Sequence, residues 1–124
     1  MRIAVTAEED SGLESRVAQH FGHAPYFIFV DVQDREITGT NGEENPFSAG
    51  HAPGQIPGFI KEQGADVILS GGMGGRAVEF FENLGVHAAT GAVGTVREAV
   101  ESYLGGELNG AAPCNESIEH GHGG

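Results

Sequence analysis

The sequence of 124 residues is poor in cysteine and tryptophan, and it contains no long apolar run. Its single cysteine, Cys114, cannot form an internal disulfide, so we expect a protein of a reducing compartment, the cytoplasm. No segment approaches the ~20 consecutive apolar residues of a membrane helix, and the N-terminus lacks the basic-then-apolar pattern of a secretory signal. These absences predict a soluble protein without a disulfide framework.

Positive charge is also scarce. Six Lys+Arg residues stand against 18 Asp+Glu residues, which gives a formal net charge of -12, and Lys61 is the single lysine. Nucleic-acid binding depends largely on basic side chains that neutralise phosphates, and an anionic membrane surface attracts the same side chains. The composition therefore excludes nucleic acid and membranes as expected partners.

What the chain does contain predicts one domain of alternating strands and helices. Hydrophobic residues make up 39%, and the length is typical of a single domain with its own core. Apolar patterning predicts strands at 1–7, 25–32, 35–40, 66–70 and 86–89. Helices are predicted at about 56–63, at 76–84 and from the capping-box pair Thr95 and Glu98 onward. A short helix is predicted at 15–19, a turn at 33–34 and a loop at 41–55.

The order of these elements predicts a mixed sheet. The later strands alternate with helices, which requires parallel pairing, whereas the hairpin of the second and third strands requires one antiparallel neighbour. The fold class is therefore α/β, with five strands and helices on the faces of the sheet. Residues 1–108 form the expected domain, and 109–124 form an expected flexible, acidic tail that carries Cys114, His120 and His122.

The segment Ser70–Arg76 is a glycine-rich turn between a strand and a helix. Free backbone N–H groups and the positive end of the helix dipole make such a turn suitable for an anion. Arg76 adds a full positive charge in the first helical turn. The alternative is that these glycines only permit a tight turn and close packing.

Three histidines lie in predicted loops elsewhere in the sequence. His20 and His23 precede the strongest predicted strand, and His51 lies in the long loop before the next helix. Neutral imidazole is a good metal ligand, and loops at one edge of such a sheet converge on a crevice. We expect His20, His51 and the glycine turn to share one pocket, whereas His87 is expected to be structural in an interior strand. The spacing of the cysteine and histidines of the tail matches no closed zinc site.

Five segments together resemble one known family: 1–7, 15–27 with its His-Phe-Gly motif, 71–77, 85–86 and 103–108. The chain is similar there to the dinitrogenase iron–molybdenum cofactor biosynthesis family, which includes NifX, NafY and the C-terminal region of NifB. The resemblance implies a ribonuclease-H-like three-layer α/β/α fold with sheet order 3-2-1-4-5 and strand 2 antiparallel. It also implies a non-catalytic carrier or scaffold for an iron–sulfur or molybdenum-containing metal–sulfur cofactor, with cofactor-donor and cofactor-acceptor proteins as partners.

Carried onto this sequence, the resemblance makes His20 the expected cluster ligand and aligns His51 with a histidine that often follows the third strand. Family members often have Arg where this chain has His23. Soft sulfide clusters also accept thioether ligands, which adds Met73. The resulting cofactor-binding prediction is His20, Gly72, Met73, Gly74, Arg76 and His51, with His20, His23 and His51 as metal ligands.

Two other functions stay open at this stage. One is a cofactor-free interaction or regulatory domain of the same fold. The other is an enzyme that acts on a small phosphorylated molecule at the glycine turn. The enzyme is the weaker alternative because the G-x-S-x-G, H-E-x-x-H and Walker motifs are absent, and because Cys114 lies in the expected tail.

Overall fold

The computed structural model of the chain describes residues 1–47, 54–108 and 110. His51, Cys114, His120, His122 and almost all of the expected tail lie outside the described residues. No helix in the described ranges is long and apolar enough to cross a membrane. The elements are β1 (Arg2–Ala7), the 3-10 turns η1 (Gly12–Glu14) and η2 (Phe21–His23), β2 (Tyr26–Gln33), β3 (Glu36–Glu44), α1 (Gln55–Glu62), β4 (Val67–Ser70), α2 (Gly75–Leu84), β5 (His87–Thr90) and α3 (Val96–Leu104).

The five strands form one sheet in the order β3-β2-β1-β4-β5. The hairpin of β2 and β3 is antiparallel, and β2 is also antiparallel to β1. The pairs β1–β4 and β4–β5 are parallel. The predicted mixed α/β sheet and its strand order are confirmed, and the ribonuclease-H-like designation stays a prediction.

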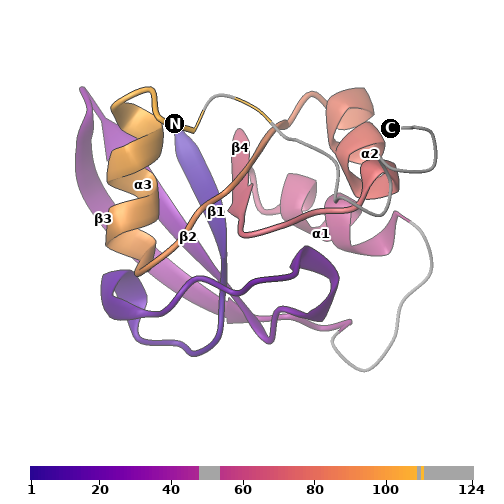
Figure 1. Cartoon of the computed structure of the whole chain (residues 1–124), viewed down its shortest axis with the longest axis horizontal. Coiled ribbons are helices and arrows are strands. Elements are labelled where there is room, and N and C mark those ends of the chain that lie inside the picture. Colours follow the sequence, from indigo (N-terminus) through magenta and orange to yellow (C-terminus); the bar gives the residue numbers. More distant parts are fainter. Residues whose placement is uncertain (48–53, 109, 111–124) are drawn as a thin grey trace.

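Helices cover both faces of this sheet (Figure 1). Alternate residues of each central strand point to opposite faces. In β1, Ala4 packs into a cluster with Ile56, Ile60 and Phe81 of α1 and α2. Its neighbours Ile3 and Val5 pack instead into a second cluster with Val96, Ala99 and Val100 of α3. Two separate apolar cores therefore hold the sheet from its two sides.

The segment 15–19 is extended, so the predicted helix there is wrong. Val17 pairs with Ala7 and Arg16 with Thr95 in isolated antiparallel bridges. The N–H of Glu8 donates to the carbonyl of Arg16 at 2.9 Å, and the N–H of Ala18 donates to the carbonyl of Thr6 at 3.0 Å. Hydrogen bonds to the end of β1 satisfy this backbone, and they replace the local bonds of a helix.

The hairpin also differs from the prediction. Its turn lies at Asp34 and Arg35, whose φ angles are 54° and 66°, one residue later than expected. Strand β3 continues to Glu44, which pairs with Tyr26, so residues 41–44 belong to the sheet and not to the predicted loop. His87 begins the edge strand β5 and is exposed, so the interior position expected for it is wrong.

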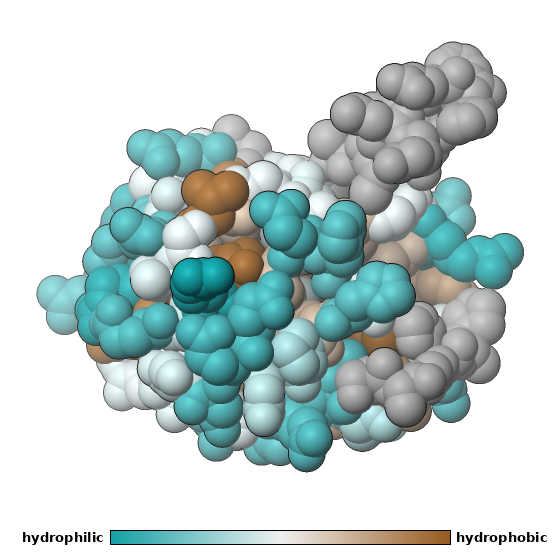
Figure 2. Space-filling model, turned by 60° about the horizontal axis from the view of Figure 1, so that its bottom comes forward, coloured by the Kyte–Doolittle hydropathy of each residue, from teal (hydrophilic) through white to brown (hydrophobic). Residues whose placement is uncertain are grey.

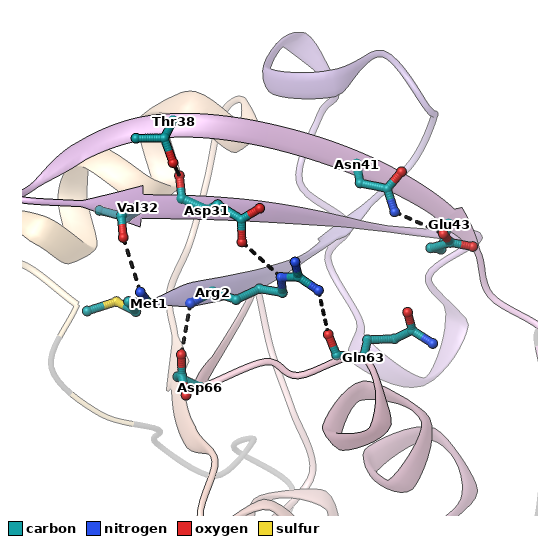
Figure 3. Close-up of polar contacts among 9 residues, drawn as sticks. All are labelled: Met1, Arg2, Asp31, Val32, Thr38, Asn41, Glu43, Gln63 and Asp66. Atoms are coloured by element: carbon teal, nitrogen blue, oxygen red, sulfur yellow. Dashed lines mark hydrogen bonds and ion pairs between the residues drawn. The ribbon is translucent and has the colours of Figure 1, made fainter.

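Arg2 joins the beginning of β1 to two neighbouring segments (Figure 3). Its Nε donates to Asp31 Oδ1 of β2 at 2.9 Å, and its Nη1 donates to the carbonyl of Gln63 at 2.7 Å. Its backbone N–H donates to Asp66 Oδ2 at 2.9 Å. The hydrogen bond with Asp31 is the main reason that the pKa of the Arg2 guanidinium is raised.

The end of β4 is crossed by the backbone of the segment before η2. A Cβ placed on Gly71 would lie 2.9 Å from the carbonyl oxygen of Gln19 and 3.0 Å from its Cα. The N–H of Gly71 donates to the carbonyl of Ala18 at 3.2 Å, and that carbonyl also accepts from Thr6 Oγ1 at 3.2 Å. Only glycine fits at this crossing, because both contacting groups are backbone and cannot move independently.

We expect Gly71→Ala to destabilise the fold by about 1–3 kcal/mol, because the added methyl group forces two backbone segments apart. Gly75→Ala is the matched control, since a Cβ there meets no atom within 4 Å. Ala in the first turn of α2 should be neutral or stabilising by up to ~1 kcal/mol. Urea unfolding of both variants measures the difference, and equal midpoints would show that the crossing tolerates a side chain.

Candidate functional site

The turn η2 anchors two exposed histidines on a buried phenylalanine. Phe21 is 5% exposed, and its ring lies 5.3 Å from the ring of Phe81 in an edge-to-face arrangement and 6.1 Å from that of Phe27. His20 and His23 flank Phe21 and are exposed. The His-Phe-Gly-His sequence therefore divides into one core anchor, a glycine and two imidazoles at the surface.

The two imidazoles lie close enough for one polynuclear ligand to contact both. Their ring centroids are 6.4 Å apart, and the rings are nearly perpendicular. His23 closes η2, where its N–H donates to the carbonyl of His20 at 3.3 Å. The local 3-10 turn thus sets the separation of the two rings.

The structure brings His20 beside the glycine turn. His20 and Gly72 form a parallel bridge, and the N–H of Phe21 donates to the carbonyl of Gly72 at 3.0 Å. The same carbonyl accepts from Ser70 Oγ at 3.0 Å. The carboxyl end of β4, the glycine turn and η2 are therefore tied together by hydrogen bonds.

A cavity of about 280 Å³ lies where η2 meets the first turns of α1 and α2. Figure 1 shows the N-terminal ends of these two helices side by side. Figure 2, which brings the bottom of that view forward, shows hydrophobic residues that reach the surface among hydrophilic ones on the side of these helices. The lining residues are Phe21, Gly22, Gly54, Ile56, Pro57, Gly74, Arg76, Ala77 and Phe80.

Neither helix at this cavity has a side-chain N-cap. Gly54 and Gly74 occupy the N-cap positions of α1 and α2, and glycine offers no side-chain acceptor for the first N–H groups. In contrast, α3 is closed by the predicted capping box of Thr95 and Glu98. Because the uncapped ends carry the positive poles of the two helix dipoles, the cavity favours an anion.

Arg76 adds a formal positive charge at the same place. Its side chain is exposed and makes no hydrogen bond or ion pair with the residues that the structure describes. The guanidinium is therefore available to a ligand. Together the Arg76 side chain, two helix N-termini and apolar walls can hold a compact anion whose faces are soft and poorly hydrated.

The remaining predicted residues lie elsewhere. Met73 is 1% exposed and packs into the core cluster of Phe21 and Phe81, so its thioether faces away from the surface of the turn. His51 lies outside the described residues. In the described ranges, no group of three or more His, Cys, Asp or Glu side chains is arranged to bind a metal ion. Among the described side chains of these types, His20 and His23 are therefore the two that could bind a metal ion at this turn.

Sequence reasoning missed the part of the cavity that α1 supplies. Gly54, Ile56, Pro57 and Phe80 line the cavity. The sequence patterns place Gly54 in the predicted loop 41–55 and the other three residues in predicted helices, and none of these patterns indicates a cavity. The signal was present in the Gly-Gln-Ile-Pro start of α1, which lacks a capping side chain. That this start meets the glycine turn depends on how α1 packs against α2.

Known proteins are similar to this chain in both fold and sequence. The protein PH0822 is 39% identical, with a TM-score of 0.78 over 88% of this chain and 95% of that one. The apo form of the orange protein from Desulfovibrio gigas is 31% identical, with a TM-score of 0.80 over 90% and 93%. An uncharacterised protein of Methanocaldococcus jannaschii is 26% identical over 110 residues, which are 87% of this chain and 89% of that protein.

A family model described as dinitrogenase iron-molybdenum cofactor matches residues 1–106. This range holds all of the regular elements, the His-Phe-Gly-His turn and the glycine turn. On this match over most of its length, the chain belongs to the dinitrogenase iron–molybdenum cofactor family.

Proposed function

We propose that the protein is a non-catalytic carrier that binds an anionic metal–sulfur cofactor, or a precursor of one, at the cavity between η2, α1 and α2. The observation that carries this proposal is the convergence of two uncapped helix N-termini and Arg76 beside the exposed pair His20 and His23. The imidazoles supply metal ligands, and the backbone N–H groups supply donors for sulfide edges. Membership of the cofactor family supports the same conclusion.

The small number of protein ligands suits a cargo that must be passed on. Resident iron–sulfur clusters are usually held by several cysteine thiolates. In this chain the single cysteine, Cys114, lies outside the described residues. The cavity itself offers the Arg76 guanidinium and backbone N–H groups, and the imidazoles of His20 and His23 flank its lining residues Phe21 and Gly22 in the sequence. A cluster held by one or two imidazoles and by weaker hydrogen bonds can leave for an acceptor that offers thiolates.

The carrier function defines the expected partners and location. A cofactor-donor protein loads the cavity and a cofactor-acceptor protein empties it, both in the cytoplasm. The cargo is an iron–sulfur or molybdenum-containing cluster, in keeping with the iron–molybdenum cofactor for which the family is named. The structural similarity to the orange protein supports the assignment of this chain to a family with that fold.

We predict that His20→Ala lowers the metal retained per chain by roughly tenfold, because it removes a direct ligand. The protein is reconstituted without oxygen with iron and sulfide, with and without thiomolybdate, and then desalted and analysed for metals. Gln19→Ala is the control. The Gln19 side chain is exposed, and the contact with Gly71 is made by its backbone, which the substitution leaves in place. Thermal unfolding of both variants verifies that the fold is unchanged.

Retention by His20→Ala equal to that of the unsubstituted protein would exclude His20 as the main ligand. No metal in any reconstituted sample, together with a recovered protein partner, would favour the cofactor-free interaction domain instead.

We predict that Arg76→Gln weakens retention by about fivefold at low salt, because an exposed charge next to an anion contributes about 1 kcal/mol. Arg97→Gln is the matched control. It removes the same charge from an exposed arginine that pairs with Glu14 at 3.2 Å. The measurement is the retained metal at two ionic strengths, and the difference between the variants should shrink as salt screens the charge.

A loss in Arg97→Gln that equals the loss in Arg76→Gln would mean that net charge alone governs binding. That result would remove Arg76 from the proposed site.

A further inference from the structure

A second cavity, of about 500 Å³, lies at the opposite end of the sheet from the candidate site. It opens where β2 ends, β5 begins and α3 ends, so it shares no residue with the cavity at the helix N-termini. Its volume is within the ~300–1,000 Å³ of typical small-molecule sites. The residues that line it are Met1, Val32, Gln33, Asp34, Arg35, His87, Tyr103, Leu104 and Leu108.

Arg35 occupies an unusual backbone position at the rim of this cavity. Its φ is 66° and that of Asp34 is 54°, the pattern of a mirror-image hairpin turn. Such turns favour glycine at the second position, and any other residue costs about 1 kcal/mol there. The turn itself does not require an arginine at this position, so the contacts of the Arg35 side chain are of interest.

The Arg35 side chain reaches from the hairpin to the end of α3. Its Nη2 donates to the carbonyl of Leu104, the last residue of that helix, at 2.8 Å. This bond fixes the guanidinium at the mouth of the cavity. Asp34 and Glu36 flank it in the sequence, yet Arg35 forms no ion pair with a carboxylate in the described ranges. Its other N–H donors therefore remain for a ligand.

The residues that β5, α3 and position 108 contribute to the cavity are aromatic and aliphatic. The rings of His87 and Tyr103 have centroids 6.0 Å apart. Tyr103, Leu104 and Leu108 are partly buried against the α3 core cluster. A tyrosine phenol is an O–H donor at physiological pH, and burial raises the pKa of Tyr103 further above that range. The cavity thus combines apolar surface from Tyr103, Leu104 and Leu108 with hydrogen-bond donors and the positive charge of Arg35.

We propose that this second cavity binds a small aromatic carboxylate, whose ring lies against Tyr103 and Leu108 and whose carboxylate meets Arg35. A planar guanidinium recognises a carboxylate through paired N–H donors. Among the described residues that line the cavity, Asp34 is the one acidic residue, whereas Arg35, Tyr103 and Gln33 all offer hydrogen-bond donors. The site is separate from the proposed cofactor site and holds whether or not that cavity carries a cluster.

The test is a titration of cofactor-free protein with benzoate at low salt, followed through backbone amide chemical shifts. We expect saturable shifts at Arg35, His87, Tyr103 and Leu108, with little change at Gly72–Arg76. Benzamide has the same ring without the charge, benzylamine has the opposite charge, and acetate has the charge without the ring. Each should bind at least about tenfold more weakly than benzoate.

Two substitutions of Arg35 separate binding from folding. Arg35→Gln should weaken benzoate binding by about tenfold, whereas Arg97→Gln, at an exposed site on α3 that pairs with Glu14, should leave it unchanged. Arg35→Gly should also lose binding while its Tm stays equal or rises, because Asp-Gly suits this turn. The proposal is overturned if benzamide or benzylamine binds as tightly as benzoate, if Arg35→Gln binds normally, or if the shifts map elsewhere.

Discussion

The backbone of residues 18–20 crosses the end of β4 at Gly71, and the candidate site depends on this contact. The carbonyl oxygen and Cα of Gln19 lie too close to the Cβ position of residue 71 for any side chain to fit there. Because the two backbones touch, the His20 backbone pairs with Gly72 and the Phe21 N–H reaches its carbonyl. A single absent side chain therefore brings together two segments about 50 residues apart in sequence, one with the histidines and one with the glycine turn.

Buried hydroxyl groups make this crossing specific as well as close. Thr6 and Ser70 are both fully buried, and their hydroxyls lie 3.3 Å apart across the parallel strands β1 and β4. Thr6 also donates to the carbonyl of Ala18, and Ser70 to that of Gly72. Buried polar groups are costly when they lack partners, so a shifted crossing would lose several bonds at once. The arrangement is thus favoured over neighbouring registers, which a purely apolar contact would not distinguish.

Sequence patterns predicted most of the elements and a mixed five-stranded sheet, and the family resemblance implied the sheet order, but less of the site was predicted. Apolar strands and the Thr95 capping box are local signals, and the structure confirms them. The extended course of 15–19 and the extra length of β3 arise from pairing with distant strands, which local propensity does not contain. The contribution of α1 to the cavity has the same origin. The roles predicted for His20, His23 and the glycine turn stay predictions, although His20 and Gly72 do lie side by side.

The distribution of arginines shows how the proposed anion site can be reconciled with an acidic chain. Arg2 and Arg97 are paired with Asp31 and Glu14, and these exposed pairs contribute little beyond local order. Arg76 has no such partner in the described ranges, and it lies at the positive poles of two helices. Screening limits the reach of the net charge of -12 to roughly 8–10 Å at moderate salt, so the local arrangement of charge governs the cavity. An anion bound at the proposed site would therefore interact mainly with the positive groups of the cavity, whereas carboxylates beyond a screening length would repel it mainly during its approach at low salt.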